Sequence, residues 1–306
     1  MKKTATLALV ILFSAVSYAQ QLPYHSQYMF NDFLINPAVA GSKDYFPIML
    51  TYRNQWIGFK DAPETMTLSM HGPVTSKQIK IGGILFTDKT GPTSRSGAAL
   101  SYVHHLQLGK DKVSFGLSAI LFQYILDKSE LTTDEPGDKA IDGGTVKKIV
   151  PEATFGVYYY GKNYYAGFSV PQLIQMKVNI GGSQLLNKMV RHYFLTAGYK
   201  FDINDNFSIE PSLLLKAITA APVQIDINSK LCYQMPGVKS PSFWLGFSYR
   251  TEESVIALLG AEKSNFSFGY SYDFTLTNIK KYSTGSHEIF AGYNLPVKKG
   301  GRALVD

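Results

Sequence analysis

The stretch that decides the fold is Ser254 to Phe274, SVIALLGAEKSNFSFGYSYDF, and its second half carries the clearest pattern in the chain. There Phe266, Phe268, Tyr270, Tyr272 and Phe274 alternate with Asn265, Ser267, Gly269, Ser271 and Asp273. Successive side chains of a strand point to opposite faces, so this strand has one aromatic face and one small polar face. The polar turn Glu262-Lys263-Ser264 joins it to the apolar run before it. The stretch therefore predicts a β-hairpin with one face in apolar surroundings.

The same unit recurs along the chain, with aromatic residues at its ends. We predict strands near 48–54, 65–71, 79–87, 97–106, 113–124, 150–160, 164–170, 192–201, 207–215, 224–233, 243–250, 254–261, 265–274 and 287–295. Aromatic residues make up 13% of the chain and charged residues only 17%, which suits a protein with much apolar surface. Bacterial single-chain barrels have an even number of strands. The chain is therefore predicted to be all-β, a transmembrane antiparallel β-barrel of the bacterial outer membrane with about 14 strands.

The connections between these strands alternate in length, as expected of such a barrel. Short turns rich in Gly, Asn, Asp or Lys are expected at 72–78, 107–112, 161–163, 202–206 and 262–264. Longer outer loops are expected at 55–64, 88–96, 125–149, 171–191 and 275–286. Two connections break the rule, the medium-length 234–242 on the inner side and the short 251–253 on the outer side.

Four segments follow from this pattern. Lys2 and Lys3, the apolar run Leu7 to Phe13 and the small residues ending at Ala19 predict a signal peptide over residues 1–19. Residues 20–46 contain the unalternated stretch QYMFNDFLINPAVAG, which we expect inside the lumen or at the periplasmic rim. The barrel is expected over residues 47–295, and a basic tail over 296–306, since Pro296 cannot extend the sheet.

The sequence shows no pattern of a catalytic, cofactor or metal site. His104 and His105 are neighbours on an expected strand and therefore point to opposite faces, and the other histidines lie at no ligand spacing. No sequence pattern singles out a nucleophile, a base and an orienting polar group that would act together. The formal net charge of +7 is spread along the chain, which argues against nucleic acid as a partner. We expect no enzyme, no cofactor and no metal.

Four stretches resemble the PorP/SprF family of type IX secretion system outer-membrane proteins. They are QYMFNDFLINPAVAG (27–41), YRNQWIGFKDAPET (52–65), GGILFTDKTGPTSRSGAALSYVHHL (82–106) and YSYDFTLTNIKKYSTGSHEIFAGYNL (270–295), in the same order as in the family. The resemblance implies a non-enzymatic outer-membrane accessory of Bacteroidota that supports secretion or surface attachment of cargo proteins such as gliding adhesins. It also implies other secretion components of the outer membrane and periplasm as partners, beside the membrane lipid.

The residues of the family stretches give candidate partner-binding positions, Tyr28, Asn36, Arg53 and Trp56. Aromatic and Arg side chains are frequent anchors of protein interfaces. Trp56 also suits the aromatic belt at the membrane surface, which requires no partner. Two other functions remain open, an outer-membrane channel or hydrophobic-solute transporter and, with less support, a lipid-modifying barrel enzyme.

Overall fold

A computed structural model describes residues 22–297 apart from 24, 75–77, 132–143, 179–188, 220 and 238–239. Its strands are β1 (Tyr45–Asn54), β2 (Glu64–Pro73), β3 (Ile79–Thr90), β4 (Thr93–Leu108), β5 (Asp111–Asp127), β6 (Thr145–Tyr160), β7 (Tyr164–Val170), β8 (His192–Tyr199), β9 (Phe201–Asp202), β10 (Phe207–Ile218), β11 (Gln224–Gln234), β12 (Ser242–Arg250), β13 (Ser254–Lys263), β14 (Phe266–Thr275) and β15 (Ser286–Pro296). Short 3-10 helices are η1 (Tyr28–Phe30), η2 (Asp32–Leu34), η3 (Pro37–Val39), η4 (Lys128–Glu130) and η5 (Asn278–Lys281).

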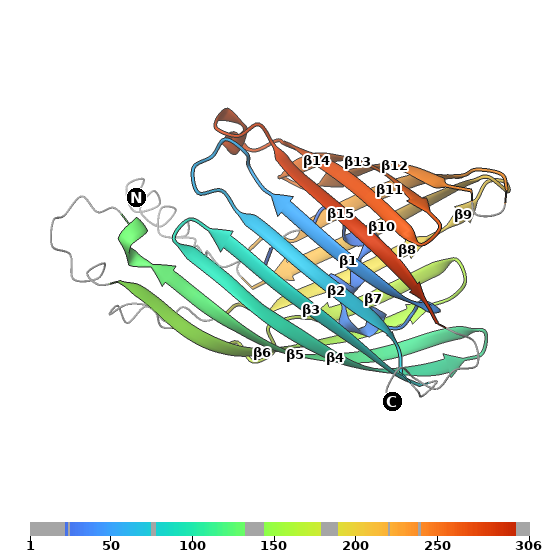
Figure 1. Cartoon of the computed structure of the whole chain (residues 1–306), viewed down its shortest axis with the longest axis horizontal. Coiled ribbons are helices and arrows are strands. Elements are labelled where there is room, and N and C mark those ends of the chain that lie inside the picture. The colour runs from blue at the N-terminus through green and yellow to red at the C-terminus, as the bar shows by residue number, and fades with distance from the viewer. Residues whose placement is uncertain are drawn as a thin grey trace, which may run out of the picture.

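The strands form one closed antiparallel barrel of 14 strands, as predicted (Figure 1). Each strand pairs with its neighbours in the chain, and β1 pairs with β15 to close the ring. The short β9 continues the pairing of β8 along β10, so these two elements act as one strand broken at Lys200. In a closed barrel every backbone polar group of a strand can pair with a neighbour, which removes the exposed edges of an open sheet.

One end of the barrel, here the loop end, carries the connections 55–63, 91–92, 128–144, 171–191, 219–223, 251–253 and 276–285. The opposite turn end carries 74–78, 109–110, 161–163, 203–206, 235–241 and 264–265. The prediction of a loop at 88–96 is wrong, because β3 and β4 continue to Thr90 and Thr93 and leave only Gly91 and Pro92 in the turn. Gly91 has a φ of 52°, a conformation that glycine adopts without cost. As a result β3 to β6 are among the longest strands, and they project beyond their neighbours at the loop end (Figure 1).

Alternation along each strand separates a lipid-facing surface from the lumen. On β14 the aromatic side chains Phe266, Phe268 and Phe274 are more than half exposed, whereas Ser271 and Asp273 are buried. The expected two faces of this strand are confirmed. No helix among the described residues is long and apolar enough to cross a membrane.

The segment between Leu22 and Asp44 lies inside the barrel, with η1, η2 and η3 in its middle (Figure 1). Tyr28 and Phe33 are almost fully buried, and η3 packs against β4, β5 and β6. Asn36 caps η3 by accepting a hydrogen bond from the amide of Ala38, and Pro37 occupies the first helical position. Both residues favour the start of a helical turn, which is why the strand pattern ends here. We call residues 25–42 the plug.

Candidate functional site

One side of the plug rests on glycines of the barrel wall. Gly116 of β5, Gly156 of β6 and Gly167 of β7 face inward at the same level. A Cβ at Gly116 would lie 2.5 Å from the amide nitrogen of Ala38, and one at Gly156 would collide with Oδ1 of Asn36. Since neither distance is tolerable for a carbon atom, these strands must carry glycine for the plug to approach them.

Hydrogen bonds hold the plug on this glycine side. Nδ2 of Asn36 donates to the carbonyl of Val157 at 3.0 Å. The hydroxyls of Ser114 and Ser169 donate to the carbonyls of Ala38 and Ile35, each at 2.6 Å. The plug backbone therefore satisfies its polar groups on the wall, as a buried irregular segment must.

The other side of the plug is held by buried charges. The carboxylate of Glu288 on β15 accepts hydrogen bonds from the amides of Ser26 and Gln27 at 2.7 and 2.9 Å. Arg53 on β1 forms ion pairs with Asp273 on β14 at 2.7 Å and with Glu288 at 3.3 Å. It also donates to the hydroxyl of Ser26 at 2.7 Å. These side chains are at most 2% exposed, so each charge depends on its partners.

The charged cluster continues around the wall, near the loop-end termini of the strands. Asp226 on β11 pairs with Arg250 on β12 at 3.2 Å and with Lys216 on β10 at 3.0 Å. Arg250 also contacts Glu253 at 3.3 Å. The cluster of Arg53, Lys216, Asp226, Arg250, Asp273 and Glu288 therefore spans six strands, and its opposite charges compensate one another.

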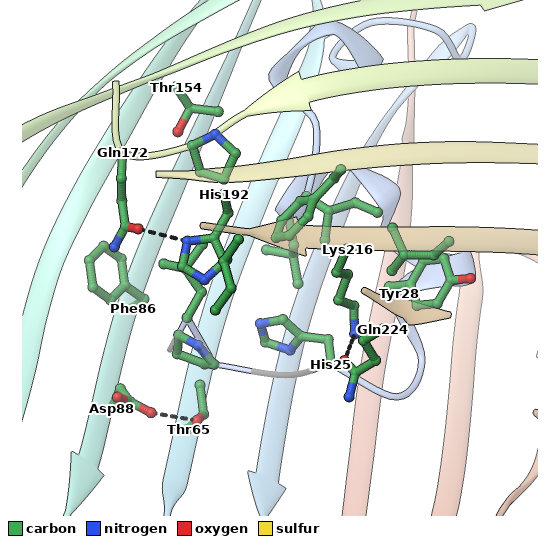
Figure 2. Close-up of a pocket in the computed structure, with 18 of the residues that line it drawn as sticks. His25, Tyr28, Thr65, Phe86, Asp88, Thr154, Gln172, His192, Lys216 and Gln224 are labelled. Atoms are coloured by element: carbon green, nitrogen blue, oxygen red, sulfur yellow. Dashed lines mark hydrogen bonds between the residues drawn. The ribbon is translucent and has the colours of Figure 1, made fainter. Parts of the chain in front are cut away.

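The plug separates two cavities. The loop-end cavity, of about 690 Å³, is lined by loop residues such as Trp56 and Pro222 and by Phe33 and Ile35 of the plug. The turn-end cavity, of about 790 Å³, is lined by turn residues such as Lys162 and by other plug residues. No described residue lines both cavities. Figure 2 shows part of the loop-end cavity, with side chains from several strands pointing into it.

His25 lies where the plug borders the loop-end cavity (Figure 2). Burial, followed by the nearby cations Arg53, Lys216 and Arg250, lowers the pKa of His25 from 6.5 to about 3. Its imidazole is therefore neutral near pH 7. Its Nδ1 is buried, and within the described part of the chain it has no hydrogen-bond partner.

The structure places three of the four candidate partner-binding residues in the plug system and the fourth at the loop end. Tyr28 and Asn36 are buried plug residues, and the hydroxyl of Tyr28 contacts Nδ2 of Asn228. Arg53 is 1% exposed within the charged cluster. Trp56 is half-buried at a φ of 54°, and its amide donates to Ser286 at 3.0 Å. Their role in partner binding stays a prediction.

Sequence reasoning missed the residues that hold the plug, which are Asp273, Glu288 and the inward glycines. The sequence signal that could have located Asp273 was the alternation of inward and outward side chains along a strand. Asp273 lies on the polar face of the predicted strand 265–274, which faces the lumen in a barrel, and a buried acidic residue there would need a cationic partner. Among the described residues, no group of three or more His, Cys, Asp or Glu side chains could hold a metal ion.

Comparison with known proteins decides the family. The model of the type IX secretion system membrane protein PorP/SprF matches residues 17–293, nearly the whole chain. The chain belongs to the PorP/SprF family. It is therefore a non-enzymatic outer-membrane component of the type IX secretion system, as the resemblance implied. No curated protein matches the chain.

Solved structures share the barrel fold of this PorP/SprF protein. The CymD monoaromatic hydrocarbon channel is 13% identical, with a TM-score of 0.53, over 92% of this chain and 95% of that one. The TodX monoaromatic hydrocarbon channel deltaS2 mutant is 11% identical, with a TM-score of 0.51, over 88% and 94%. At such identities the likeness concerns the fold alone.

Proposed function

We propose that this PorP/SprF protein holds exported cargo proteins, such as gliding adhesins, at the outer surface during type IX secretion or attachment. Family membership supports this role, since the family is a membrane component of that secretion system. The observation that carries the proposal is the filled lumen. When a packed plug divides the lumen, a partner can still contact the rim of the barrel. Among the described residues, no open passage for a polypeptide joins the two cavities.

The loop end carries a surface suited to such contacts. Loops 55–63 and 276–285 are joined by hydrogen bonds between the amide of Ile57 and the carbonyl of Gly285, and between the amide of Thr284 and the carbonyl of Ile57, both 2.8 Å long. Phe59 is 49% exposed and Tyr282 is 70% exposed on these loops. We call the surface formed by Phe59, Lys60, Lys280, Lys281 and Tyr282 the loop face; its three lysines are also exposed.

The chemistry of the loop face indicates the kind of partner. Aromatic side chains supply contact area at a small cost in conformational entropy, and lysines attract acidic groups. Because backbone hydrogen bonds join the two loops, the backbone that carries these side chains is held in place before binding. An acidic segment of a cargo protein with apolar side chains fits this surface.

A display assay tests the proposal. In a deletion strain, the gene carrying Phe59→Ala and Tyr282→Ala should restore barrel abundance but lower cargo display several-fold, since the loss of one aromatic anchor costs about 2 kcal/mol or more. The matched control is Phe201→Ala with Phe266→Ala, two aromatic residues near the turn end that are 51% and 54% exposed. Normal cargo display by the variant with Phe59→Ala and Tyr282→Ala would contradict cargo binding by the loop face. Display of every type IX cargo by the deletion strain contradicts the accessory role.

Orientation is tested separately. The proposal requires the loop end to face the medium and the turn end to face the periplasm. An epitope between Ile203 and Asn204 should therefore bind antibody only after the outer membrane is broken. Labelling of that epitope on intact cells would reverse the topology and exclude cargo contact through the loop face.

The alternative of a hydrophobic-solute channel has less support. The apolar loop-end cavity ends at the plug and does not continue into the turn-end cavity. Passage of a solute would require the plug to leave both the glycine side and the charged side. The cavity is better explained as a place where a molecule stays bound.

A further inference from the structure

The loop-end cavity has the size and lining of a small-molecule site. Its volume of about 690 Å³ lies within the range of pockets that enclose small ligands. Apolar side chains dominate its wall, among them Ile84, Phe86, Ile120, Phe122 and Phe194. Such a lining favours a hydrocarbon body, whose removal from water provides the affinity.

Several polar groups of this cavity are already paired with protein partners. Asp88 accepts hydrogen bonds from Thr65 at 2.8 Å and Arg95 at 2.6 Å. The carboxylate of Glu152 accepts from the amide of Met176 at 2.9 Å, and His192 contacts Gln172 at 2.9 Å. Among the described lining residues, the buried polar atoms without a hydrogen-bond partner are the hydroxyls of Thr67 and Thr277 and, next to the charged cluster, Nδ1 of His25. A ligand with one hydrogen-bonding group would satisfy Nδ1 of His25.

The electrostatic surroundings of His25 define the head group. The charges that act on His25 most strongly are the cations Arg53, Lys216 and Arg250. Figure 2 shows His25 and Lys216 at the same cavity. These cations also pair with Asp226, Asp273 and Glu288, but no carboxylate is among the charges that act most strongly on His25. A neutral imidazole can donate its Nδ1 hydrogen to an anion, and the balance of charges around His25 favours a negative charge at that position.

We propose that the loop-end cavity binds an apolar molecule with a single carboxylate, a fatty-acid-like amphiphile, whose carboxylate accepts a hydrogen bond from His25. Its hydrocarbon body lies among the apolar side chains of β3 to β5, and the plug keeps it on the loop-end side. This site is separate from the loop face and does not depend on cargo binding.

Equilibrium binding to the purified full-length protein in lipid nanodiscs tests the site, after subtraction of binding to empty nanodiscs. The radiolabelled probes are dodecanoic acid, 1-dodecanol and dodecane, which share a chain length and differ in head group. The wild type should bind dodecanoic acid saturably and at least tenfold more tightly than dodecane, with 1-dodecanol between them. Equal affinity for all three probes would overturn the carboxylate assignment, and no saturable binding of any probe would overturn the site.

Two kinds of variant locate the binding. Ala99→Phe fills the cavity from β4 and should weaken all three probes at least tenfold, whereas its control Leu100→Phe faces the lipid at 73% exposure and should not. If Ala99→Phe does not fold, Ile84→Phe fills the same cavity from β3, and Leu85→Phe is its lipid-facing control. Unchanged binding by the folded cavity variant would overturn the site.

His25→Leu removes the proposed donor and keeps an apolar side chain. It should weaken dodecanoic acid about tenfold, as expected for one hydrogen bond to a charged group, and leave dodecane unchanged. His104→Leu is the matched control, since His104 lies on β4 with the opposite orientation to the lumen residue His105. An equal loss for acid and alkane, or no loss for the acid, would overturn the role of His25.

Discussion

The plug is held by shape on one side and by charge on the other. On the side of β5 to β7 glycines leave room for Asn36 and Ala38, and the contacts are neutral hydrogen bonds. On the side of β1, β14 and β15 the contacts are Arg53, Asp273 and Glu288, all buried. A fit by shape fails when an atom is added, whereas a fit by charge fails when one partner is removed. Substitutions can therefore test the two sides separately.

The largest effect is expected on the charged side. Arg53→Ala leaves Asp273 and Glu288 buried without their cation, which typically costs about 3–5 kcal/mol. The variant should unfold at lower denaturant concentration, and its N-terminal segment should become sensitive to protease. Trp244, whose ring lies 4.9 Å from that of Phe30 in the plug, offers a fluorescence signal for the movement.

Arg53→Lys serves as the control for Arg53→Ala. Lysine restores the positive charge but lacks the planar guanidinium group that binds two carboxylates. The loss in free energy of unfolding should therefore lie between zero and that of Arg53→Ala. An Arg53→Ala variant as stable as the wild type would show that the plug does not depend on the charged side.

A smaller effect is expected on the glycine side. Gly156→Val places a side chain where Asn36 lies, and overpacking typically costs about 1–3 kcal/mol. The displaced plug should let ions pass in planar bilayers. The control is Gly83→Val, since a Cβ there meets its nearest neighbours at 3.9 Å. Equal ion conductance by Gly156→Val and Gly83→Val would show that the close fit at Gly156 does not hold the plug in place.

The effect of Asn36→Ala should be smaller again. It removes the cap of η3 and the hydrogen bond to Val157, for an expected cost of about 1–2 kcal/mol. The plug should stay in place but exchange its amide hydrogens faster at Ala38 and Val39, as hydrogen exchange with mass spectrometry would measure. Unchanged protection of η3 would show that the glycine pocket alone positions it.

The smallest effect is expected at an exposed ion pair. Lys200 and Asp202 lie 3.6 Å apart near the turn end, and both side chains are about half exposed. Water screens such a pair, so Lys200→Ala should change the free energy of unfolding by less than about 0.5 kcal/mol in the denaturant titration used for Arg53. A loss as large as that of Arg53→Ala would mean that burial does not distinguish the two pairs.

Alternation predicted the strands and the two faces of the wall, because a period of two is a local property of the chain. It could also have placed Arg53, which shares the inward parity of Thr51 and Gln55 while Tyr52 points outward. The loop at 88–96 was wrongly predicted, because the ladder pairing of β3 with β4 continues through these residues up to Thr90 and Thr93. Contacts such as Asn36 with Val157 join residues 121 positions apart, which no local pattern reveals.

The position of Glu288 has a consequence for the order of assembly. Glu288 is the direct partner of Arg53 across the β1 and β15 pair that closes the barrel, and it also binds the amides of Ser26 and Gln27. The first part of the folded chain to leave the cell interior thus finds one of its docking sites only in β15, the last strand. Until β15 arrives, Ser26 and Gln27 lack their bonds to Glu288, and Arg53 lacks one of its two carboxylate partners. Completion of the plug therefore reports that β15 has been delivered and that the ring has closed.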